Sequence, residues 1–158
     1  MRIAILMLNC GRGSGEVARQ QARYLLSQGH QIYFIQPQAG SGLEGAFDQE
    51  VTLHGDVLPV HEYLPSADKK QKAVATMGYE EAVAYLPAYE NALEAVIREV
   101  DLVIGHHANI TATATCNIAK RHAKPYVLFL HGTGIEPRHQ GLYDDQVWNL
   151  IEAAVESA

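Results

Sequence analysis

The chain has 158 residues, of which 47% are hydrophobic and 19% are charged, and its formal net charge is −6. This length and composition predict one globular domain with a hydrophobic core of its own, and the acidic balance argues against a nucleic-acid partner, because it supplies no basic face. The cysteines, Cys10 and Cys116, are far apart in a chain that is not rich in cysteine, which favours reduced thiols in a cytoplasmic protein. The opening apolar run is too short for a secretory signal or a membrane span.

The first 29 residues predict a strand, a glycine-rich turn and a helix. The run from Arg2 to Asn9 is apolar without alternation, which is typical of a strand buried on both faces of a parallel sheet. The turn from Gly11 to Glu16 holds three glycines in five residues, so its backbone N–H groups can come close to a phosphate at the start of the helix. We expect Ser14 to cap this helix, Glu16 to favour its first turn and Gly29 to end it. Its inner face is expected to carry Val17, Ala18, Ala22, Leu25 and Leu26.

The rest of the chain predicts alternating strands and helices. Buried strands are expected at 31–36, 101–105 and 126–130, with short strand candidates at 51–54 and 57–60. Helices are expected at 78–99, where Pro87 either kinks one helix or starts a second, at 109–122 with Asn109 as its cap, and at 144–157. The segment 40–50 is expected to be a loop and 64–72 to be polar and exposed. This alternation predicts an α/β fold with a doubly wound, mostly parallel sheet.

Three strand ends carry the polar and glycine residues of this predicted sheet. They are the glycine turn after the first strand, the segment 106–109 and the segment 131–134. In open parallel sheets the ligand lies beyond the carboxyl ends of the strands, where the strand order reverses. The sequence therefore predicts a binding site there, and a functional role for His131.

Three other interpretations of these residues were weighed. A dinucleotide site is disfavoured, because Glu16 stands where the fingerprint has its third glycine and Gln36 stands where the second strand has its acidic residue. A purely structural turn, in which the glycines allow close packing of strand and helix, stays open. No metal is expected, because the spacing of the histidines at 106, 107, 131 and 139 matches no metal-ligand motif.

Three runs resemble glycosyltransferase family 4, the group 1 retaining sugar transferases of GT-B fold. They are GSGEVARQQARYLLSQGHQIYFI at 13–35, VDLVIGHHAN at 100–109 and KPYVLFLHGTG at 124–134. In this family a glycine turn and a glutamate precede a helix that ends in Gly-His, and two later strands end in histidine and in His-Gly. The resemblance implies that residues 1–158 form a single Rossmann-like, acceptor-side domain, the N-terminal half of a GT-B fold.

The resemblance also implies a reaction and a set of site residues. A nucleotide-diphosphate sugar is the donor substrate, with no cofactor, and the acceptor is a sugar or a lipid-linked molecule. By position, Gly11, Gly13, Gly15 and Glu16 would approach the donor diphosphate or the acceptor. His131, with Gly132 beside it, would lie against the donor sugar at the reacting centre. The residues expected to line the acceptor pocket are His106, Asn109, Thr133 and Arg138. The turn here is longer than the glycine pair of the family, so which glycine faces the ligand stays open.

The family's C-terminal donor domain is missing from this sequence. The last helix resembles one that leads into a further strand in the family, so we expect an N-terminal piece of a longer transferase, inactive alone, with its donor domain in cis. Two alternatives stay open, a non-catalytic module that binds a small ligand or phosphate, and one subunit of a split transferase. An exposed apolar patch around Ala153, Ala154 and Val155 would favour the split form. Membrane association is not indicated, because no strongly basic surface helix is present.

Overall fold

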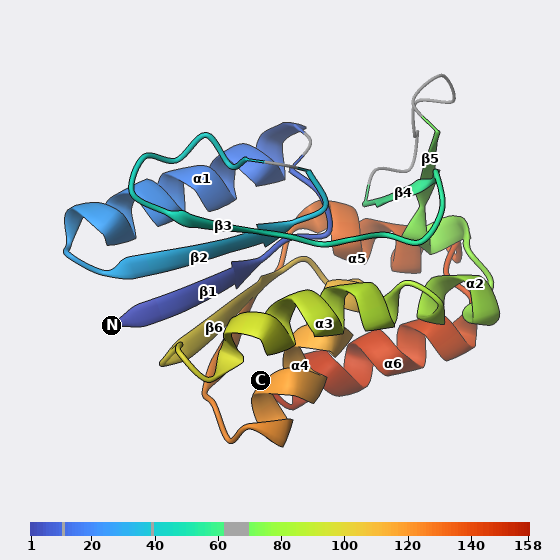
Figure 1. The fold of residues 1–158 in the computed structure, drawn as a ribbon. Coiled ribbons are helices and arrows are strands. Elements are labelled where there is room, and N and C mark those ends of the chain that lie inside the picture. Colours follow the sequence, from blue (N-terminus) through green and yellow to red (C-terminus); the bar gives the residue numbers. More distant parts are fainter. Residues whose placement is uncertain (11, 39, 62–69) are drawn as a thin grey trace.

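The structure, a computed structural model, describes residues 1–10, 12–38, 40–61 and 70–158 (Figure 1). Its centre is a five-stranded sheet in the order β3-β2-β1-β6-β7, with every neighbouring pair parallel. The strands are β1 (Arg2–Leu6), β2 (Gln31–Gln36), β3 (Phe47–Glu50), β6 (Leu102–His106) and β7 (Tyr126–Phe129). A second, two-stranded parallel sheet pairs β4 (Leu58–Val60) with β5 (Gln71–Ala73).

Helices cover both faces of the large sheet, which confirms the doubly wound α/β class. Figure 1 shows α1 (Arg12–Ser27) on one face and α3 (Leu86–Ile97), α4 (Ile110–Arg121) and α6 (Asp145–Glu156) on the other. The short helices α2 (Tyr79–Val83) and α5 (Gly132–His139) and the β4-β5 sheet lie toward the carboxyl ends of the strands (Figure 1). A 3-10 turn, η2 (Val74–Thr76), follows β5. None of the described helices is both long and apolar enough to cross a membrane.

The central strand explains the apolar run at the start of the chain. Ile3 and Ile5 of β1 pack with Ala18 and Ala22 of α1. The residues of β1 that point to the opposite face, Ala4 and Leu6, belong to a second buried cluster together with side chains of the helices on that face. Successive side chains of a strand point to opposite faces, so a strand between two helical layers needs apolar residues at every position. Members of the second cluster include Ala4, Leu6, Leu93, Ile97 and Ile118.

The helix that follows β1 begins earlier than the sequence suggests. Because α1 starts at Arg12, Ser14 lies within the helix and Glu16 lies beyond its first turn, so both predicted capping roles are wrong. Val17 is 46% exposed and does not belong to the inner face, whereas Ala18 and Ala22 are buried as predicted. The predicted end is confirmed, since Gly29 has a φ of +81°, the left-handed conformation that terminates helices.

Two segments of the middle of the chain differ from the prediction. The predicted loop 40–50 contains β3, which pairs with β2 and stacks Phe47 on Tyr33 with ring centroids 5.1 Å apart. Of the two strand candidates, 51–54 is not a strand, whereas 57–60 contains β4. Residues 64–69 of the predicted exposed segment lie outside the described residues, and Gln71 and Lys72 belong to β5.

Pro87 starts a second helix, as it stands in the first turn of α3.

The last third of the chain follows the prediction except at β7 and α5. Asn109 and Asp144 cap α4 and α6 through their side chains. The strand β7 was expected to be buried on both faces, yet Val127 and Phe129 are each 43% exposed, because β7 is an edge strand. The segment 132–139 forms α5, a helix that the sequence did not predict. Ala154 is buried, so residues 153–155 do not make an exposed apolar patch.

Candidate functional site

The order of the strands reverses between β1 and β6. From β1 the chain adds β2 and β3 on one side and later returns to add β6 and β7 on the other. Leu6 of β1 pairs with Gly105 of β6, so the segments that leave these two strands start side by side. His106 ends β6, and His107 donates its backbone N–H to the carbonyl oxygen of Phe129 at the end of β7. All three predicted segments therefore lie at the edge where doubly wound folds bind ligands.

A cavity of about 540 Å³ opens between the N-termini of two helices at this edge. The N-terminal turns of α1 and α5 both contribute to its wall, and the unpaired N–H groups of a helix start favour an anion. His61, which follows β4, forms part of the wall, and its Nε2 lies 3.0 Å from Oγ of Ser14. The lining residues are Gly13, Ser14, Val17, His61, His131, Gly132 and Thr133.

Four histidines gather beside this cavity. Nδ1 of His106 lies 3.0 Å from Nε2 of His131, and Nε2 of His106 lies 3.0 Å from Oε1 of Gln21 on α1. The ring of His107 stacks on that of His61 at a centroid distance of 4.0 Å and lies 4.4 Å from that of His131. Since the four histidines come from three separate segments of the chain and Gln21 from a fourth, the tertiary fold and not a local motif assembles the cluster.

Three of the four histidines have a pKa below the ordinary value. Burial lowers the pKa of His106 to about 4, with a further contribution from His131. Burial and three neighbouring imidazoles lower the pKa of His107 to about 2, and burial lowers that of His131. At neutral pH these three imidazoles are therefore favoured in the uncharged form, which can donate or accept hydrogen bonds according to tautomer.

His107 combines two features that are uncommon in a folded protein. Its φ is +71°, a conformation that non-glycine residues rarely adopt. Its side chain is fully buried, and neither ring nitrogen has a hydrogen-bond partner among the described residues. Strain and unpaired buried polar atoms occur together most often at functional sites.

The glycines of the site have two distinct surroundings. No atom lies within 4 Å of a Cβ built on Gly13 or on Gly132, and both residues line the cavity. A Cβ on Gly15 would stand 2.8 Å from the carbonyl carbon of Cys10, and one on Gly134 would stand 2.9 Å from the backbone nitrogen of Ala108. Gly15 and Gly134 thus allow close packing, whereas Gly13 and Gly132 leave open space for a ligand. Gly11 lies outside the described residues.

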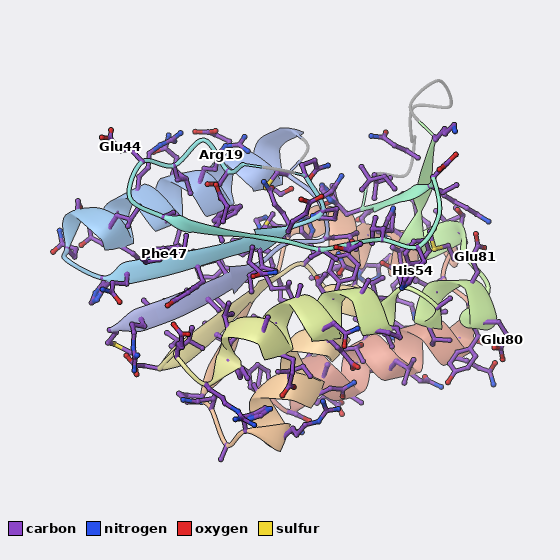
Figure 2. The ribbon with its side chains drawn as sticks, viewed as in Figure 1. Arg19, Glu44, Phe47, His54, Glu80 and Glu81 are labelled. Atoms are coloured by element: carbon purple, nitrogen blue, oxygen red, sulfur yellow. The ribbon has the colours of Figure 1, made fainter. Side chains whose placement is uncertain are left out.

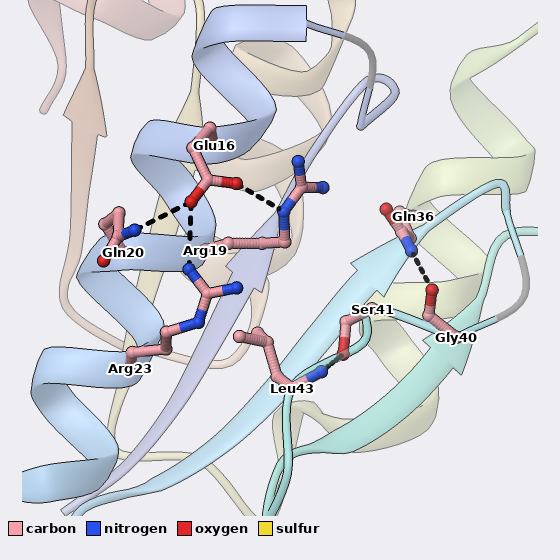
Figure 3. Close-up of polar contacts among 8 residues, drawn as sticks. All are labelled: Glu16, Arg19, Gln20, Arg23, Gln36, Gly40, Ser41 and Leu43. Atoms are coloured by element: carbon pink, nitrogen blue, oxygen red, sulfur yellow. Dashed lines mark hydrogen bonds and ion pairs between the residues drawn. The ribbon is translucent and has the colours of Figure 1, made fainter.

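Five of the predicted site residues that the structure describes do not line the cavity. Gly15 is packed against Cys10, and His106, expected in the acceptor pocket, is fully buried and contacts His131 instead. Glu16 lies on the outer surface of α1, where it accepts hydrogen bonds from Arg19, Gln20 and Arg23 (Figure 3). The bonds from the two arginines hold its pKa below the ordinary value. Arg138 pairs with Asp145 at 2.8 Å, and its guanidinium lies over the ring of Trp148. Asn109 is buried, and its Oδ1 accepts the backbone N–H of Thr111.

Two members of the site, His61 and Gln21, were not predicted from the sequence. His61 follows a short strand in a segment with no recognisable motif, and Gln21 lies mid-helix among other polar residues. His107 lies in the predicted strand-end segment 106–109, but no role of its own was predicted for it. In the described ranges no three side chains of the types that ligate metals are arranged to hold an ion.

Two smaller hollows lie away from the histidine cluster. One, of about 210 Å³, is lined in part by His54, Glu81 and Tyr85, and Figure 2 shows the first two at the α2 end of the molecule. The other, of about 320 Å³, includes Glu50 and Asn91 and shares His54. Neither hollow contains a residue that the sequence singled out.

The fold is a Rossmann-like domain with a cavity at the point where the strand order reverses, where such folds bind ligands. Residues 11–158 match Glycosyltransferase Family 4. This match spans nearly the whole chain, and the protein therefore belongs to glycosyltransferase family 4. A comparison with curated proteins finds no match to the chain.

Proposed function

We propose that this chain is the N-terminal, acceptor-side domain of a retaining glycosyltransferase that moves a sugar from a nucleotide-diphosphate sugar to an acceptor. One observation carries the proposal. In a member of a glycosyltransferase family, Gly13 at the start of α1 and residues 131–133 at the start of α5 line the same cavity. Two helix N-termini that face one cavity suit a leaving group that gains negative charge during the reaction.

The proposed mechanism relies on electrostatic stabilisation. As the bond between sugar and diphosphate breaks, charge develops on the departing phosphate, and preorganised N–H donors stabilise that charge more than they stabilise the ground state. Gly13 and Gly132 leave room for the phosphate to approach the backbone. His131 lies against the donor sugar, and Thr133 lies on the acceptor side. His106 supports His131 from behind through their hydrogen bond.

The proposal assigns the remaining parts of the reaction to other molecules. The nucleotide sugar is a substrate, no resident cofactor is involved, and a C-terminal domain in cis supplies most of the donor contacts. The acceptor is a sugar or a lipid-linked molecule, and the reaction takes place in the cytoplasm. Gly11, Glu16 and Arg138 stay in the proposed site as residues that closure of the two domains brings to the ligand. Gly15 and Asn109 act there indirectly, Gly15 through its close packing on Cys10 and Asn109 as the buried cap of α4.

The test is the turnover of the natural protein that contains this domain, purified from its source organism and assayed for nucleoside diphosphate release. His131→Ala should lower turnover by about a hundredfold or more, the usual effect of removing one group that stabilises developing charge. His139→Ala is the matched control, because His139 is an exposed histidine near the end of α5, outside the cavity.

Two results would contradict the proposal. Equal turnover of the His131→Ala variant and the unchanged protein would remove His131 from the reacting centre. Robust turnover by residues 1–158 alone would show that no donor domain is needed. If the natural protein ends near Ala158 and gains activity only with a second chain, the split form of the transferase replaces the two-domain form.

A further inference from the structure

A hydrogen-bonded chain of three side chains runs from α1 to the cavity. Oε1 of Gln21 is an amide oxygen, which only accepts hydrogen bonds, so Nε2 of His106 carries the hydrogen between them. Burial keeps His106 neutral, and its Nδ1 is then a lone-pair acceptor. The hydrogen between His106 and His131 must therefore belong to Nε2 of His131. Gln21 thus fixes the tautomers of both imidazoles.

The nitrogen of His131 that remains basic is Nδ1. This atom has no hydrogen-bond partner among the described residues, and His131 lines the cavity. A proton added at Nδ1 leaves the bond from Nε2 to His106 unchanged, because a protonated imidazole donates from both nitrogens. His131 can therefore become a cation without breaking the network that holds it.

No fixed cation among the described residues balances a charge placed in this cavity. The described lining residues include no lysine, arginine or carboxylate. The titratable groups that pack on His131 are His106 and His107 from the end of β6, and His61 stacks on the far side of His107. Among the charged side chains that the structure describes on α1 and α5, Glu16 pairs with Arg19 and Arg23, and Arg138 pairs with Asp145. The side chain of Arg12 lies outside the described part of the structure.

We propose that Gln21 and His106 are positioning residues that hold His131 in its Nε2–H form, and that the cavity binds an oxyanion together with one proton, taken up from water at Nδ1 of His131. The inference rests on the proposed function, because the oxyanion it concerns is the phosphate end of the nucleotide sugar. The imidazolium formed on binding supplies the positive charge that the described lining lacks. Without an anion the neutral form of His131 is favoured, because burial lowers its pKa.

The test uses nuclear magnetic resonance on the 158-residue chain with 15N-labelled imidazoles, and sulfate as the probe. Sulfate is a dianion throughout the range studied, so any pH dependence of its binding comes from the protein. Chloride keeps the ionic strength constant. We expect Nε2–H as the tautomer of free His131, and a rise in its pKa when sulfate binds. The Kd for sulfate should then fall as the pH is lowered from about 8 to about 6, by up to about tenfold per pH unit, which is the limit for linkage to one proton.

Three variants separate the roles of the residues. His131→Gln should abolish the pH dependence of sulfate binding, because glutamine does not titrate in this range. Gln21→Leu removes the acceptor that fixes the tautomers, so the imidazole spectrum should show a mixture of both neutral forms of His131. His139→Gln, outside the cavity, should match the unchanged protein in both measurements.

The outcomes distinguish this inference from the proposed function. One outcome is that sulfate shifts the amide signals of Gly13, Gly132 and Thr133 with a Kd that does not depend on pH. That result would overturn proton uptake and leave the anion site intact. A free His131 in the Nδ1–H form would overturn the positioning role of Gln21 and His106. If sulfate leaves these amide signals unchanged at every pH, the cavity does not bind the anion. The phosphate contact of the proposed function is then overturned as well.

Discussion

Gly13 and Gly15 stand two residues apart in α1 and meet opposite surroundings. The Cα of Gly15 is pressed against the backbone of Cys10, where a Cβ would be 2.8 Å from the carbonyl carbon and oxygen. Backbone atoms cannot move aside as a flexible side chain can, so a methyl group there forces the helix off the loop. At Gly13 the same methyl group meets no atom within 4 Å.

Gly15→Ala should therefore destabilise the domain by about 1–3 kcal/mol, the usual cost of overpacking. Gly13→Ala should stabilise it by up to about 1 kcal/mol, because alanine favours the helix over glycine. The free energies of unfolding in urea, compared between the two variants and the unchanged protein, check both values. Changes of the same sign would show that the two positions do not differ as described.

The roles of single residues were harder to predict from the sequence than the fold or its elements. The three glycines of the turn look alike in sequence, and only the position of Cys10 separates the packing role of Gly15 from the open surface at Gly13. The cavity joins Gly13 to His131, as the motif order predicts, but it also contains His61, whose neighbours in sequence form no motif. A residue that reaches a site through tertiary packing leaves no local signal.

At the scale of elements, α4 depends on its cap more than an exposed helix would. Oδ1 of Asn109 accepts hydrogen bonds from the backbone N–H of Thr111 at 2.9 Å and from the hydroxyl of Thr111 at 2.6 Å. The first turn of α4 is fully buried, so water cannot replace these bonds. Nδ2 of Asn109, in contrast, is buried without a partner among the described residues.

Asn109→Ala should destabilise the domain by about 2 kcal/mol, since it removes a cap and leaves a buried N–H unpaired. Asn109→Ser should cost less, because serine keeps a capping oxygen and removes the unpaired Nδ2. Thermal unfolding of both variants is the measurement. If serine destabilises as much as alanine, the capping bond is not what Asn109 contributes.

Element prediction succeeded where burial demands a strong pattern. β1, β2 and β6 lie inside the sheet and carry continuous apolar runs, and the start of α4 is marked by its cap. β3 has the sequence Phe-Asp-Gln-Glu, and as an edge strand it is mostly exposed, so no apolar pattern was required of it. α5 contains two glycines and Pro137 within eight residues, and it gave no helical signal.

At the scale of the whole molecule, the histidine cluster couples folding to pH. Folding holds His106 and His107 neutral, with pKa values of about 4 and about 2, whereas an unfolded chain has histidines of pKa near 6.5. Between these values the unfolded chain binds more protons than the folded domain. The stabilisation is therefore complete above about pH 6.5 and is lost progressively as the pH falls toward the folded-state values.

The free energy of unfolding should decrease by roughly 1 kcal/mol per pH unit below about pH 6.5 for each of these two imidazoles. Urea unfolding at a series of pH values from about 7.5 to about 4.5 gives the slope. His107→Asn removes one imidazole that titrates in this range and suits the positive φ of this position, so its slope should be less steep by roughly 1 kcal/mol per pH unit over the same range. His139→Gln, which removes a histidine outside the cluster, serves as the control. A slope that His107→Asn leaves unchanged would mean that other groups cause the loss, and that burial of this cluster does not set the acid stability of the domain.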